Sequence, residues 1–122
     1  MNVHNGLGNG FQEVIYQRAL EIELQWAGLA YKREMEMPIY YKEICIGSRR
    51  VDFFVAELVM VELKAIIKLE DVHLAQAKNY LEAYHMSVGL LINFGAERLD
   101  FKRVINKELY LQLKISEKSP NP

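Results

Sequence analysis

Residues 51–64 read Val-Asp-Phe-Phe-Val-Ala-Glu-Leu-Val-Met-Val-Glu-Leu-Lys, two apolar runs with one short turn between them. The pattern predicts a β-hairpin that turns at Ala56-Glu57-Leu58. Side chains alternate across a strand, so Glu62 and Lys64 are expected on one face, and Val61 and Leu63 on the other. Two charged side chains would then share one face of an otherwise apolar hairpin.

The symmetry of this hairpin brings a second carboxylate to the same place. Pairing centred on Glu57 makes the numbers of partner residues sum to 114, so Asp52 falls opposite Glu62. Like charges at about 5 Å repel each other, and apolar surroundings make the repulsion hard to relieve with water alone. A divalent cation would relieve it. Oxygen ligands suit Mg²⁺, and a lysine beside them can orient or deprotonate an attacking water.

Two features leave this interpretation open. The turn contains no glycine, proline or asparagine to fix its type, and a slip of one residue would break the Asp52–Glu62 pairing. The charged residues could also simply end two strands in solvent, because an Asp-x9-Glu-x-Lys spacing arises by chance as well.

The rest of the chain surrounds this hairpin with helices and further strands. Gly28 suits a helix end, Pro38 suggests an edge strand or a bulge, and a break is expected near Lys42-Glu43. The expected helices cover residues 11–27 and 70–84, and the expected strands cover 31–46, 49–55 (after a turn at Gly47-Ser48), 58–63, 87–94, 99–105 and 109–115. This order is α-β-β-β-α-β with one or two added strands, which indicates one sheet with helices packed on it. We expect a single domain over residues 1–122, with 1–10 as a flexible lead-in and 116–122 as a frayed tail.

Polar residues on the two helices extend the candidate site. The first helix is apolar on two sides and is therefore expected between layers. Glu13 lies in line with the second of these sides, formed by Tyr16, Leu20 and Leu24, either at its rim or held there for a function. On the second helix, Gln76 and Asn79 share a face with the small apolar residues Val72, Ala75 and Ala83, which mark that face as packed. Gln76 is either a buried amide with its own partners or a group that reaches the phosphate-binding centre.

The composition restricts the class of protein. A net charge of −1 argues against a tight, extended DNA-binding surface, which is usually basic. The single cysteine, Cys45, excludes an internal disulfide, and its apolar surroundings predict a buried free thiol in a reducing compartment. No apolar run approaches the roughly 20 residues of a membrane span, so the expected location is the cytoplasm.

These residues resemble the GxxExxY proteins, which are similar to the PD-(D/E)XK nuclease superfamily. The resemblance begins at Gly10-x-x-Glu13-x-x-Tyr16 and covers nearly the whole chain. Its other motifs are Val51-Asp52, Val61-Glu62-Leu63-Lys64-Ala65, the helical run from His73 through Gln76 to Tyr80, and the segment from Gly89 to Gly95.

The resemblance implies an α/β fold with a restriction-endonuclease-like αβββαβ core, a central mixed sheet flanked by helices, and one or two added C-terminal strands. It implies a nuclease that acts on nucleic acid, DNA in the first place, with Mg²⁺ as cofactor and Mn²⁺ as its substitute. Asp52 and Glu62 would bind the metal, Lys64 would serve the hydrolytic water, and Glu13 and Gln76 would complete the catalytic set. We further expect Leu63 among the metal ligands and Arg50 and Lys68 in contact with nucleic acid.

Two other functions compete with a nuclease. The near-neutral charge also suits a non-catalytic module that binds nucleic acid or protein through the same fold. The apolar alternation at residues 109–115 suggests an exposed edge strand, which could pair two subunits into a homodimer.

Overall fold

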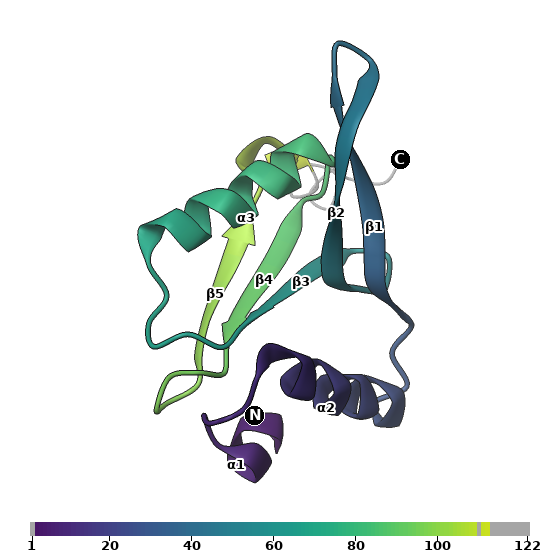
Figure 1. Ribbon diagram of the computed structural model, residues 1–122. Coiled ribbons are helices and arrows are strands. Elements are labelled where there is room, and N and C mark those ends of the chain that lie inside the picture. The colour runs from purple at the N-terminus through teal and green to yellow at the C-terminus, as the bar shows by residue number, and fades with distance from the viewer. Residues whose placement is uncertain (1, 110, 113–122) are drawn as a thin grey trace.

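The computed structural model describes residues 2–109, 111 and 112 (Figure 1). The helices of this part are α1 (Asn2–Leu7), α2 (Glu13–Trp26) and α3 (Asp71–Ala83). The strands are β1 (Tyr31–Tyr41), β2 (Ile44–Val55), β3 (Val59–Lys64), β4 (Val88–Asn93) and β5 (Asp100–Ile105). The expected α-β-β-β-α-β order is therefore confirmed from α2 to β4, and β5 is an added edge strand.

The described strands form one mixed sheet in the order β1-β2-β3-β4-β5. Strands β3 and β4 are parallel, and every other neighbouring pair is antiparallel. The parallel pair is joined through α3, as a crossover connection requires. Strand β3 lies at the centre, and its residues 60–63 are buried, as its nearly continuous apolar sequence predicts.

The two faces of the sheet carry separate cores. Tyr16 and Leu20 of α2 pack with Val61 and Leu63 of β3 on one face. Ala77 and Leu81 of α3 form the other core, together with the buried residues Val51, Met60 and Val104. In Figure 1, α2 and α3 accordingly lie on different sides of the sheet. Alternation along β3 thus sends Val61 and Leu63 towards α2, and Met60 and Glu62 towards α3.

Helix α2 covers the sheet with one apolar side only. The side with Tyr16 and Leu20 is buried, whereas Trp26 on the other side is 81% exposed and Ile22 is 48% exposed. The expectation that this helix lies between two layers was therefore wrong. Its C-terminal stop at Gly28 is confirmed, because Gly28 has a φ of +70°. The Gly28 amide donates to the Gln25 carbonyl and the Leu29 amide to the Leu24 carbonyl, which satisfies two carbonyls in the last turn of the helix.

The segment before α2 is not the flexible lead-in that we expected. Residues 2–7 form α1, and Val3 is buried in the same core as Tyr16. The Tyr16 hydroxyl donates to the Gly8 carbonyl at 2.7 Å and accepts from the Phe11 amide at 3.1 Å. Its ring stacks on Phe94 with a centroid distance of 4.6 Å. Tyr16 therefore fixes the chain that leads into Glu13, the first residue of α2.

Removing this hydroxyl should lower the free energy of unfolding. Tyr16→Phe keeps the stacked ring but leaves the Gly8 carbonyl and the Phe11 amide without their partner, which costs about 1–3 kcal/mol. Urea unfolding measures the loss. Tyr40→Phe is the matched control, because Tyr40 is 62% exposed and should tolerate the change. Equal stability of the two variants would show that Tyr16 does not anchor this segment.

The distal part of β1 and β2 forms a hairpin arm (residues 38–48) that extends beyond the rest of the sheet (Figure 1). Its turn lies at Lys42 and Glu43, where the break was expected, and these residues have φ values of +48° and +67°. The expected turn at Gly47-Ser48 was wrong: β2 runs through these residues, and the register shifts between Ile39 and Tyr40 on the paired strand. Pro38 lies on the edge strand, as expected. Cys45 lies in the arm and is exposed, so the prediction of a buried thiol was wrong.

The expected C-terminal strand at residues 109–115 is not formed where the structure describes the chain. Residues 107–109 and 111–112 are helical, and residues 110 and 113–115 lie outside the described part. The homodimer that rested on this strand remains a prediction. In the described residues, each helix is too short or too polar to cross a membrane.

Candidate active site

Asp52 lies where the pairing of β2 is interrupted on both sides. Towards β3, the pairs Val55–Val59, Phe54–Met60 and Phe53–Val61 stop one position short of it. Towards β1, the pairing passes from Arg33–Phe53 to Met35–Val51, and the skipped residue Glu34 has a φ of +51°. Such a φ is rare for a residue with a side chain and marks local strain.

This interruption reverses the faces of the neighbouring residues. Val51 and Phe53 would share a face in a regular strand, yet Val51 packs in the core beside α3 and Phe53 in the core beside α2. The Asp52 side chain therefore points towards the end of β3. Its Oδ2 atom accepts a hydrogen bond of 2.7 Å from the Leu63 amide.

The predicted register of the hairpin is confirmed, because all three observed pairs of β2 and β3 have numbers that sum to 114. Ala56 and Glu57 form the turn with φ values of +54° each. Two positive φ angles match the twist of a tight hairpin, although glycine or asparagine usually supplies them. The ladder stops before Asp52, so Asp52 and Glu62 do not form the direct pair that we expected. The Asp52 carboxylate instead bonds the amide of the next residue, Leu63.

Glu62 is the most buried acid of the site, with 6% of its surface exposed. Burial, with a smaller contribution from Asp52, raises the pKa of its carboxyl to about 7 against the attraction of Arg49. Its Oε2 atom accepts a hydrogen bond of 3.0 Å from Arg49 Nη2. Its Oε1 atom is buried and has no hydrogen-bond partner among the residues that the structure describes. A buried carboxylate oxygen without a partner is costly, and it is available to a ligand.

Lys64 and Glu13 complete the group of charges. Lys64 ends β3, two residues after Glu62, and is half-buried. Burial raises the pKa of Glu13, and Asp52 raises it further, while Lys64 and Arg49 oppose the shift. Burial likewise raises the pKa of Asp52, opposed first by its hydrogen bond from the Leu63 amide. The four ionisable residues of the expected catalytic set, which come from α2, β2 and β3, are thus coupled electrostatically.

Gln76 reaches this group from α3, but not as part of a packed helix face. The buried side of α3 consists of Ala77 and Leu81, whereas Gln76 and Asn79 are exposed. The prediction that Gln76 shares the packed face was therefore wrong. Gln76 nevertheless lines a small cavity of about 10 Å³ together with Glu62, Lys64, Arg49, His73, Ala77, Tyr80 and Leu91. This volume has room for roughly one water molecule.

The remaining expected residues lie in different surroundings. The Leu63 side chain is fully buried and its amide bonds Asp52, so only its carbonyl oxygen could serve as a metal ligand. Arg50 is exposed and pairs in register with Glu36 on β1, and Lys68 is exposed in the loop before α3. Neither of the two basic residues lines the cavity beside Glu62.

The donor set fits a hard divalent cation that keeps several waters. Within the described residues, no group of three or more His, Cys, Asp or Glu side chains stands ready to hold a metal. Asp52, the free oxygen of Glu62 and the Leu63 carbonyl are nevertheless oxygen donors close in sequence and structure. Mg²⁺ is commonly bound by one or two carboxylates and completes its shell with water.

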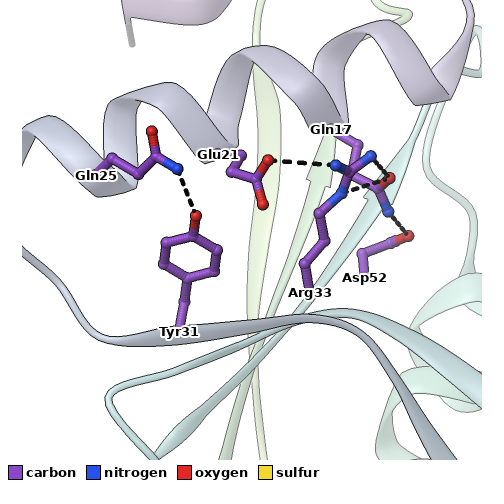
Figure 2. Close-up of polar contacts among 6 residues, drawn as sticks. All are labelled: Gln17, Glu21, Gln25, Tyr31, Arg33 and Asp52. Carbon is purple, nitrogen blue, oxygen red and sulfur yellow. Dashed lines mark hydrogen bonds and ion pairs between the residues drawn. The ribbon is translucent and has the colours of Figure 1, made fainter.

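A polar chain that was not predicted from the sequence holds Asp52 from α2 (Figure 2). The buried Gln17 donates from Nε2 to Asp52 Oδ1 at 3.0 Å. Its Oε1 atom accepts two hydrogen bonds from Arg33, at 2.8 and 3.1 Å, and Arg33 also donates to Glu21 at 3.2 Å. The available signal was the spacing of Glu13, Gln17 and Glu21, because residues four apart share one helix face.

Arg49 is a further residue of the site that was not predicted from the sequence. It follows Gly47-Ser48, where we expected a turn. In the structure its guanidinium lies 4.0 Å from the centre of the Tyr80 ring and bonds Glu62.

Comparisons with known proteins agree with this arrangement. A model of the PD-(D/E)XK nuclease superfamily matches residues 1–104. The fold is also similar to a solved structure described as "Crystal structure of SSO0001", with a TM-score of 0.52 and 15% sequence identity. The match covers 90% of this chain and 61% of that chain, and at this identity it concerns the fold alone. No curated protein matches the chain. The expected restriction-endonuclease-like core is confirmed.

Proposed function

Since this chain belongs to the PD-(D/E)XK nuclease superfamily, we propose that it is a Mg²⁺-dependent nuclease that hydrolyses phosphodiester bonds, with DNA as its substrate. Nucleases of this superfamily typically use divalent metals. The observation that carries the proposal is the buried Glu62 oxygen without a partner, beside Asp52 and Lys64. We also propose, from the Glu13 and Tyr16 motif, that the chain belongs to the GxxExxY group.

Each residue has a proposed part in the reaction. Asp52 and Glu62 would hold the cation, with the Leu63 carbonyl and Glu13 as further ligands, directly or through water. A cation held there would polarise a phosphate oxygen and lower the pKa of a coordinated water. Lys64 orients the attacking water, takes part in its deprotonation and stabilises negative charge on the phosphate. Gln76 lies at the rim of the same cavity and donates to a phosphate oxygen. Arg50 and Lys68 contact the nucleic acid farther from the site.

The polar chain of α2 supports this proposal. Gln17 fixes one oxygen of Asp52 and the Leu63 amide fixes the other. Each oxygen keeps lone pairs for a cation, while the orientation of the carboxylate is already set. Groups that hold a ligand in place from behind are typical of metal sites.

Cleavage assays with matched variants test the proposal. We expect the wild-type chain to cut DNA with Mg²⁺ or Mn²⁺ and to lose this activity in EDTA. Asp52→Asn and Glu62→Ala should each abolish it, because each removes a charged metal ligand. Equal cutting by the wild type and both variants would identify a contaminating nuclease and contradict the proposal. Parallel RNA and single-stranded DNA substrates then define the substrate class.

The second candidate is a non-catalytic module that binds nucleic acid or protein. Its support is the net charge of −1 and the lack of a ready three-ligand metal group within the described residues. Titration with Mn²⁺ separates the two functions. Metal binding that disappears in Glu62→Ala supports the nuclease, and a chain that binds DNA without any response to metal supports the module.

A further inference from the structure

Arg49 and Glu62 form an ion pair in which one buried polar atom of each side chain has no hydrogen-bond partner among the described residues. Arg49 Nη2 and Glu62 Oε2 are 3.0 Å apart, and the side chains are 29% and 8% exposed. Arginine and a carboxylate commonly meet through two parallel hydrogen bonds, which satisfy both oxygens. Here Arg49 Nε and Glu62 Oε1 are both buried and have no partner among the described residues.

An ion pair that only stabilised the fold would not be expected to leave two buried polar atoms without hydrogen bonds. An unsatisfied buried polar atom costs free energy, and here each partner carries one. The guanidinium is also held from a second side, because it stacks over Tyr80 with Cζ 4.0 Å from the ring centre. Arg49 thus places a positive charge beside the buried acid but satisfies only one of its two oxygens.

We propose that Arg49 is a positioning residue that occupies Glu62 in the metal-free protein and competes with the divalent cation for this carboxylate. The inference rests on the proposed function. Without metal, Arg49 compensates the buried charge of Glu62 and keeps its carboxylate in place. When the cation binds the free Oε1 atom of Glu62, the two positive charges repel each other, so the guanidinium gives up Glu62 and remains over Tyr80.

Metal affinity provides a test that does not depend on activity. Arg49→Met removes the charge while its sulfur and methylene groups can still pack on Tyr80. By calorimetry at pH 8.5, this variant should bind Mn²⁺ more tightly than the wild type, on the order of tenfold, because no positive charge beside Glu62 opposes the cation. Arg49→Lys keeps a charge and should stay near the wild-type value. Arg18→Ala, an exposed change on α2, is the matched control and should leave the affinity unchanged.

A measurement on the wild type guards against a variant that does not fold. The Arg49 Nε–H resonance should shift during a Mg²⁺ titration with the same apparent Kd as the resonances of Glu62. A wild type that binds metal without this shift would overturn the inference, as would an Arg49→Met variant that binds no more tightly. If neither protein binds metal, the proposed function is wrong as well.

Discussion

Replacing Lys64 with alanine should lower the rate of metal-dependent DNA cleavage by about 10²–10⁴-fold, the usual contribution of a positioned acid–base group. Lys64 is half-buried at the end of β3, two residues after Glu62, and lines the same cavity. The variant retains Asp52, Glu62 and the Leu63 carbonyl, so its affinity for Mn²⁺ should change little. The loss should therefore fall on the chemical step.

Single-turnover kinetics and calorimetry measure the two effects separately. Lys32→Ala is the matched control, because Lys32 is exposed on β1 and is not part of the proposed site. A Lys64→Ala variant that cuts as fast as the wild type would refute the role of Lys64. A parallel loss of metal affinity would instead place Lys64 in the structure of the metal site.

Replacing Glu62 with glutamine should stabilise the fold at pH 8 by about 3 kcal/mol. The pKa of this carboxyl is raised from 4.5 to about 7 despite the attraction of Arg49. Each unit of such a shift corresponds to about 1.4 kcal/mol. Between pH 4.5 and 7 the folded protein retains a proton that the unfolded chain has lost, so ionisation of Glu62 lowers stability as the pH rises. Glutamine cannot ionise and avoids this loss.

Urea unfolding of both proteins at pH 4 and pH 8 checks the pH dependence. The advantage of Glu62→Gln should be present at pH 8 and absent at pH 4, where Glu62 is protonated in both states. Glu97→Gln in an exposed loop serves as control and should change little at either pH. An advantage that does not vary with pH would contradict the assignment. Mg²⁺ at pH 8 should stabilise the wild type more than the variant.

Local patterns in the sequence were sufficient to predict most of the fold. The symmetry of residues 51–64 predicts the correct hairpin register, and Gly28 predicts the helix stop. Apolar runs place β3, β4 and β5 to within one or two residues. These features depend on residues close in the chain, where alternation and turn chemistry act directly.

Features that depend on distant packing were not predictable in the same way. Alternation assumes a regular strand, but the interruption at Asp52 and Glu34 turns Val51 and Phe53 to opposite faces. Arg49, before this interruption, consequently reaches Glu62. The packed side of α3 was also misjudged, because small residues at positions 75 and 83 suggested a contact that Ala77 and Leu81 make instead.

The strained backbone at Glu34 also bears on how the protein can evolve. Glycine adopts a φ of +51° without strain, so Glu34→Gly would lower the cost of the distortion and keep it. A β-branched residue such as valine disfavours this φ, so Glu34→Val would favour a regular ladder, with the Asp52 carboxylate on the face of Phe54 instead of at the end of β3. Residue 34 is therefore under two opposing demands, an unstrained strand and an Asp52 carboxylate at the end of β3. A sequence selected for stability alone would straighten these strands, whereas one that keeps the carboxylate at the end of β3 has to retain the distortion.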